Sequence, residues 1–151
     1  MSTPASFTVQ QLADIQACYD LVVDCAQIID ESRYEDLGLI FTEDGIFARP
    51  TVPDEPIVSR AAIIASFKKR PANLVGQHLV LNIRVRLTGA DTAEGNSSIM
   101  LYLTESEVPY EPGKGRKARG PLLGVYKDLY VRTADGWRIK DRRGRVTMYG
   151  G

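Results

Sequence analysis

The hydrophobic pattern changes period near Gly76, and this change constrains the fold more than any other feature of the sequence. Before Gly76 most apolar residues recur every three or four positions, which is the spacing of helices that pack by one face. From 79 to 87 they occupy every second position, as in a half-buried strand, and further strand-like segments follow at 92–105, 119–132 and 136–149. The pattern predicts an α+β fold with helices first and an antiparallel meander after them.

Three helices are expected ahead of this meander. Thr8 and Gln11 have the spacing of a capping box, and they precede a helix of about 20 residues. Ser32 is expected to cap a short second helix, and Ser59 a third helix over residues 59–69. The buried stripe of the first helix is predicted to consist of Leu12, Ile15, Tyr19, Val22, Cys25 or Ala26, and Ile29.

The segment between the second and third helices is predicted to be mostly irregular. Asp44 and Gly45 indicate a turn, and residues 46–49 a short strand. Residues 50–56 are rich in proline and are expected to form a loop, because proline cannot donate to a strand ladder. A later loop at 108–121 is rich in glycine, proline and charged residues and is predicted to be the most mobile segment.

Length and charge narrow the class of protein. A chain of 151 residues can bury one core without metal or disulfide support, so we expect residues 1–151 to form a single domain. Its 19 basic and 19 acidic residues leave no net charge to recruit nucleic acid, and no apolar run is long enough to span a membrane. The first eight residues lack a signal-peptide pattern, so a cytoplasmic location is expected.

Neither a metal site nor a disulfide is expected. His78 is the one histidine and there is no Cys-x-x-Cys pair, so a zinc site would need mostly carboxylate ligands. Cys18 and Cys25 are predicted to lie two turns apart on one helix, which is too far for a disulfide. We therefore expect two free thiols, no metal ion and no cofactor.

His78 and Asp30 are the residues best suited to proton transfer. His78 begins the first long strand, and an imidazole that a neighbouring carboxylate orients is a competent general base. Asp30 ends the long helix, where its charge opposes the helix dipole. Each has a plainer interpretation. Strict alternation places His78 on a solvated face with Arg84 and Arg86, and Asp30 can simply point into water.

The last predicted strand carries cations on both of its faces, so one of them is expected to face inward if the sheet packs on helices. An inward arginine could hold an anionic group on a substrate. The residues alone favour a second interpretation, a basic edge that pairs with Glu105 or Glu107 across strands. The cations are Lys140, Arg142, Arg143 and Arg145.

Several motifs follow one another in a recognisable order. A long capped helix and a short helix lead into residues 39–45 (Leu-Ile-Phe-Thr-Glu-Asp-Gly), and a third helix precedes residues 77–82 (Gln-His-Leu-Val-Leu-Asn). The last strands include residues 135–139 (Asp-Gly-Trp-Arg-Ile). This order, over about residues 12–148, resembles the SnoaL-like group of the nuclear transport factor 2 superfamily. The resemblance implies a cone-shaped α+β barrel, in which a long helix and two shorter helices pack in a curved antiparallel sheet around an apolar pocket. It also implies a homodimer or homotrimer.

The resemblance also implies roles for individual residues. In the dehydratase and dehydrochlorinase members, an Asp at the end of the first helix orients a His at the start of the strand after the third helix, and Asp30 and His78 match these positions. Arg142 matches an Arg that follows the last-strand Trp, with Arg143 as the neighbouring alternative. Cys25 stands where those enzymes carry a Lys or Tyr, which departs from the pattern.

The function that the resemblance implies is a cofactor-independent lyase, of the dehydratase type, acting on a hydrophobic cyclic small molecule. His78 would be the general base, Asp30 would orient it, and Arg142 would stabilise a departing or enolate oxygen. A ketosteroid-type isomerase needs the same residues. A noncatalytic binding protein, or a small subunit of a ring-hydroxylating dioxygenase, is the alternative from a different class. The residues expected to bind the substrate are Cys25, Phe47, Phe67, Ile99 and Leu101.

Overall fold

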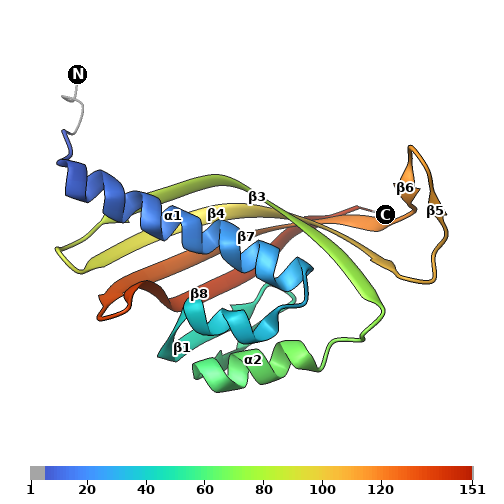
Figure 1. Cartoon of the computed structure of the whole chain (residues 1–151), viewed down its shortest axis with the longest axis horizontal. Coiled ribbons are helices and arrows are strands. Elements are labelled where there is room, and N and C mark those ends of the chain that lie inside the picture. Colours follow the sequence, from blue (N-terminus) through green and yellow to red (C-terminus); the bar gives the residue numbers. More distant parts are fainter. Residues whose placement is uncertain (1–5, 151) are drawn as a thin grey trace.

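The structure is a computed structural model that describes residues 6–150, and its centre is a curved six-stranded sheet with the helices on one face (Figure 1). The elements are α1 (Val9–Asp30), the 3-10 helix η1 (Tyr34–Leu39), β1 (Phe41–Arg49), β2 (Val52–Val58), α2 (Arg60–Lys68), β3 (Leu74–Leu87), β4 (Thr92–Glu105), β5 (Tyr110–Glu111), β6 (Gly115–Arg116), β7 (Arg119–Thr133) and β8 (Gly136–Tyr149). The strand order is β2-β1-β8-β7-β4-β3, so the sheet is open along β2 and β3. This is the predicted α+β cone, without closure into a barrel.

The predicted caps of α1 and α2 are confirmed, whereas that of η1 is wrong. Thr8 Oγ1 accepts from the backbone N–H of Gln11, and the Gln11 side chain accepts from the backbone N–H of Thr8. Ser59 Oγ accepts from an amide in the first turn of α2 at 3.2 Å. Ser32 does not cap η1, because it lies in a left-handed turn (φ 57°) directly after α1.

The buried stripe of α1 is confirmed from Val22 to Ile29 and differs from the prediction in the first half of the helix. Leu12 and Tyr19 are exposed, and Asp14 faces inward in the first half of the helix. The inward carboxylate is satisfied because Arg132 and the indole of Trp137 donate to it, at 2.7 and 3.1 Å. The buried residues of α1 are Asp14, Cys18, Leu21, Val22, Cys25, Ala26, Ile28 and Ile29.

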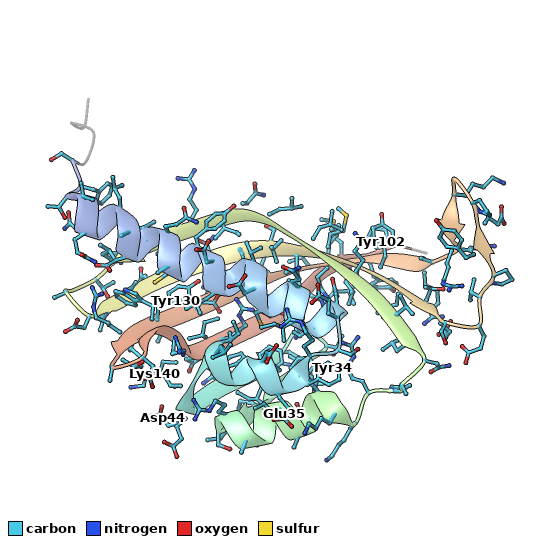
Figure 2. All side chains as sticks on the ribbon, in the orientation of Figure 1. Tyr34, Glu35, Asp44, Tyr102, Tyr130 and Lys140 are labelled. Atoms are coloured by element: carbon cyan, nitrogen blue, oxygen red, sulfur yellow. The ribbon has the colours of Figure 1, made fainter. Side chains whose placement is uncertain are left out.

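Between η1 and α2 the chain is more regular than predicted. Asp44 and Gly45 lie inside β1, where the register against β8 is irregular, and Asp44 points away from the protein (Figure 2). The expected loop at 50–56 is mostly strand β2. Prolines are tolerated in β2 because it is an edge strand, so one side needs no hydrogen-bond donors. An unpredicted feature is the parallel pairing of β1 with β8, which makes the sheet mixed.

The predicted meander is confirmed as β3-β4-β7-β8, with every neighbouring pair antiparallel. β4 and β8 have the predicted bounds, whereas β3 begins earlier, at Leu74. The loop at 108–121 contains the small β5–β6 hairpin, which projects beyond the end of the sheet (Figure 1). The mobility of this loop stays a prediction.

A register shift in β3 places His78 and Arg84 on opposite faces of the sheet. Pairing with β4 shifts between Leu81 and Arg84, and Asn82 within the shift has a φ of 51°. Such a bulge adds one residue and turns the following side chains to the opposite face. His78 therefore shares the helix-facing side with Ile83, and the predicted placement of His78 beside Arg84 on a solvated face is wrong.

The core fills the space between the helices and the inner face of the sheet. Tyr130 lies beneath α1 (Figure 2), is 1% exposed, and donates its hydroxyl proton to Asp128. On the outside of the helical layer, Glu35 of η1 lies next to α2 (Figure 2) and forms an ion pair with Lys68. Buried contacts thus join the helices to the sheet, and a surface ion pair joins η1 to α2.

Candidate functional site

A cavity of about 240 Å³ lies between the end of α1, the aromatic side chains of β1 and α2, and the inner face of β3, β4 and β7. Its wall is mostly apolar and carries three basic side chains. The lining residues are Ile29, Phe47, Arg49, Pro50, Thr51, Phe67, Arg70, Leu74, His78, Ile99, Leu101, Leu103, Leu122 and Tyr126. The volume is just below the range usual for drug-sized ligands, so the cavity suits a compact molecule.

Asp30 holds His78 at the wall of this cavity through two hydrogen bonds. The backbone N–H of His78 donates to Asp30 Oδ2 at 2.7 Å, and the ring Nδ1 lies 2.5 Å from Asp30 Oδ1. A carboxylate accepts hydrogen bonds, so Nδ1 carries the ring proton. Within residues 6–150, Nε2 makes no hydrogen bond and is the ring nitrogen left for a ligand.

The position of Asp30 follows from the way α1 crosses the sheet. Asp30 is the last residue of α1, where the helix dipole disfavours a negative charge. The two hydrogen bonds from His78 offset this disadvantage, and both side chains are largely buried, at 19% exposed for Asp30 and 12% for His78. The two residues that the sequence singled out for proton transfer are thus in direct contact.

Four of the five residues predicted to bind a substrate line the cavity. Phe47 and Phe67 are stacked, with ring centroids 5.7 Å apart, and Ile99 and Leu101 come from the inner face of β4. Cys25 is not among the lining residues. It is 2% exposed, and burial raises the pKa of its thiol.

Arg142 faces the inside of the protein, as the resemblance implied, but it lies outside the cavity wall. The favoured pairing of the last strand's cations with Glu105 or Glu107 is wrong, because Glu105 pairs with Arg119 and Glu107 accepts from Asn73. Its Nε and Nη2 each donate to Asp128 at 2.8 Å, and its guanidinium stacks on the ring of Tyr126 at 4.4 Å. Burial would lower the pKa of Arg142, but the charge of Asp128 outweighs it and holds that pKa well above its usual range. Arg143 is exposed and pairs with Asp141.

Two arginines and a tyrosine of the cavity wall were missed by sequence reasoning as binding groups: Arg49, Arg70 and Tyr126. Arg49 stacks on Phe67 at 4.5 Å, and its pKa is lowered by burial and then by the charge of Arg70. Burial raises the pKa of Tyr126, so its hydroxyl stays a hydrogen-bond donor. No local motif marks these residues, because they converge only in the folded chain.

A second, larger hollow of about 680 Å³ lies over β3, β4 and β7, away from His78. Both signs of charge line it, including Arg84, Glu94 and Lys127, and it holds no histidine or cysteine. Over the described residues, no group of three or more His, Cys, Asp and Glu side chains is arranged to bind a metal ion. Within residues 6–150, no helix has both the length and the apolar character that crossing a bilayer requires.

Comparison with known families gives one match that spans most of the chain. A family described as the SnoaL-like domain matches residues 10–143. A search of curated proteins finds no significant match.

Solved structures with the same fold include proteins of several kinds. One, from Novosphingobium aromaticivorans and provisionally named a scytalone dehydratase, has a TM-score of 0.78 at 22% identity and covers 95% of this chain and 91% of its own. Another from that organism, provisionally named an aromatic ring hydroxylase, has a TM-score of 0.76 at 25% identity and covers 93% and 94%. A type 2 hexachlorocyclohexane dehydrochlorinase has a TM-score of 0.77 at 16% identity and covers 94% and 90%.

Proposed function

The chain belongs to the SnoaL-like domain family, and from this premise we propose that it is a cofactor-independent lyase that removes water from a compact, hydrophobic cyclic molecule. The observation that carries the proposal is the contact between His78 and Asp30 at the wall of an apolar cavity. Membership of the family and the cavity together support a small-molecule-binding role. The elimination itself is our proposal.

His78 acts as the general base and then as the general acid. Its Nε2 takes a proton from a carbon next to an activating carbonyl, and the electron pair of that C–H bond forms the new double bond. The neighbouring C–O bond breaks, and the departing hydroxyl takes the proton back from Nε2 and leaves as water. Asp30 keeps the proton on Nδ1 and stabilises the imidazolium between the two transfers.

We assign Arg142 a positioning role in this reaction in place of direct contact with the departing oxygen. It does not line the cavity, its Nε and Nη2 already donate to Asp128, and its guanidinium stacks on the ring of Tyr126. Tyr126 lines the cavity, so its hydroxyl is a candidate donor to the substrate oxygen. Loss of Arg142 should therefore act through the fold and through Tyr126.

The proposed assembly is a homodimer or homotrimer. Apolar side chains of β3 that face away from the helices are 40–43% exposed, namely Val75, Leu79 and Leu81, and Tyr102 of β4 is 37% exposed beside them. Exposed apolar area of this kind is typical of a surface that another chain covers. Analytical ultracentrifugation should give a dimer or trimer mass, and Leu79→Asp should shift it toward the monomer. A wild-type monomer at high concentration contradicts the assembly.

The test is turnover of a panel of hydroxylated cyclic ketones in D2O, with loss of water and deuterium uptake both read by mass spectrometry. The wild type should release water from at least one compound, and His78→Gln should lower kcat/KM by about 10²–10⁴-fold. Asp30→Asn should also lower kcat/KM, because the ring loses its orienting carboxylate. Asp20→Asn is the matched control, since Asp20 is an exposed carboxylate on the same helix.

Each outcome of this test separates the alternatives. Deuterium uptake without loss of water would replace the lyase by an isomerase that uses the same two residues. Turnover that is unchanged in His78→Gln would contradict the role of His78. No reaction with any compound, together with binding in the cavity, would favour the noncatalytic binding protein or subunit.

A further inference from the structure

We propose that the natural ligand of the cavity carries a carboxylate, which Arg49 and Arg70 bind while its reacting carbon lies at His78. This inference deepens the proposed function and rests on it for the identity of the site. It concerns the class of substrate, which neither the family nor the His78–Asp30 contact specifies.

The first observation is the charge of the cavity wall. Arg49 and Arg70 both line the cavity, and no carboxylate is among the lining residues. Two carboxylates close to lining residues are already engaged: Asp30 accepts hydrogen bonds from His78 at both oxygens, and Asp128 accepts from Arg142 at both of its oxygens. The cavity wall therefore holds two guanidinium groups without an acidic counterpart.

The second observation is the surroundings of the two guanidinium groups. Within the part of the chain that the structure describes, neither one forms an ion pair with an acidic side chain. Arg49 donates to Ser66 Oγ at 2.9 Å and stacks on Phe67, so its position is fixed by neutral groups. Two like charges that share a partly buried wall repel each other, and a bound anion relieves that repulsion.

The third observation is where this charge lies relative to His78. Arg70 Nη2 is 3.7 Å from the point that a Cβ on Gly76 would occupy. Gly76 is two residues before His78 on β3 and on the same side of the strand, which corresponds to roughly 7 Å. A carboxylate at Arg70 would therefore place the next ring of the molecule beside the imidazole.

The chemistry of the two arginines favours a carboxylate over a neutral polar group. A guanidinium presents its donors in a planar fork that matches the two oxygens of a carboxylate. The rest of the wall, from Phe47 and Phe67 to Leu101 and Leu122, suits the apolar ring of the same molecule. An aromatic or alicyclic carboxylic acid of one or two rings combines both requirements.

Isothermal titration calorimetry with matched probes tests the inference. Benzoate, cinnamate and 2-naphthoate are each compared with the corresponding amide, which has nearly the same shape without the charge. At least one acid should bind about 10-fold or more tighter than its amide, and Arg70→Met should weaken that acid by about 10–100-fold while leaving the amide unchanged. Arg70→Lys should recover part of the loss, because it keeps the charge without the fork. Arg116→Met, on the β5–β6 hairpin, is the matched control and should bind as the wild type does.

The design separates this inference from the proposed function. His78→Gln should keep the preference for the acid, because His78 does not hold the carboxylate. If His78-dependent turnover is found but no acid binds better than its amide, the anion site is overturned and the lyase stands. If an acid is preferred but no compound is turned over, the anion site stands alone. Absence of binding for all three acids also overturns the inference.

Discussion

Removing the carboxylate of Asp128 should be among the most damaging single changes to this protein. The Asp128 side chain is fully buried and that of Arg142 is 3% exposed, and two hydrogen bonds of 2.8 Å join them. Asp128→Ala leaves a buried guanidinium without its counter-charge, and it also removes the acceptor of the Tyr130 hydroxyl. The expected loss is about 3–5 kcal/mol in the free energy of unfolding. For a chain of this size, that loss lowers Tm by about 6–20 °C.

Urea unfolding followed by circular dichroism measures this loss, and two further variants interpret it. Asp141→Ala is the matched control, because Asp141 makes the same paired contact with Arg143 at the surface, and its loss should cost less than about 1 kcal/mol. The double variant Asp128→Leu/Arg142→Met removes both charges and should recover most of the stability. An Asp128→Ala variant as stable as the control would refute the reasoning. So would a double variant no more stable than Asp128→Ala alone.

Three further predictions concern other titratable groups. The hydrogen bond from Arg132 is the main cause that lowers the pKa of Asp14 to about 2. Ionised Asp14 therefore stabilises the fold at pH values above its unfolded-state pKa of about 3.9, and this contribution is lost as the pH falls toward 2. Asp14→Asn should flatten the acid unfolding curve in that window, and an unchanged curve contradicts the assignment. Burial raises the pKa of Cys18 to about 12 and that of Cys25 above its usual value. Ellman's reagent at pH 8 should therefore label neither thiol until the protein is unfolded. Rapid labelling of the native protein would contradict this prediction. Arg70→Met without ligand should leave stability unchanged or raise it by up to about 1 kcal/mol, because it removes a like charge beside Arg49, and a clear loss would show that Arg70 has a structural partner.

The parts of the fold that the sequence predicts well are those with local signals. The bounds of β4 and β8 follow from alternation and flanking turns, and the cap of α1 follows from Thr8 and Gln11. β2 was missed because its prolines argue against a strand, and only its place at the sheet edge makes them acceptable. The pairing of β1 with β8 joins segments far apart in the chain, so no local pattern predicts it.

The residues of the site also divide into those that local sequence signals indicate and those that only the folded chain brings together. Asp30 and His78 were found from their positions at the ends of predicted elements and from the family resemblance. The face of His78 was predicted wrongly because the bulge at Asn82 breaks the alternation, and an Asn, although it tolerates a positive φ, does not by itself predict a bulge. Arg49 and Arg70 were not singled out because only the folded chain brings the end of β1 and the residue after α2 to one cavity.

The measurement that tests the central claim most directly is the ¹⁵N NMR spectrum of the His78 ring, in wild type and in Asp30→Asn, on protein without tag histidines. As the one histidine in the sequence, His78 needs no assignment strategy. For the neutral ring, we predict a protonated Nδ1 and an unprotonated Nε2 in the wild type, and loss of this preference when the carboxylate is removed. A proton on Nε2 in the wild type, or the same spectrum in both proteins, would contradict the proposal that Asp30 prepares His78 to take a proton from a ligand in the cavity.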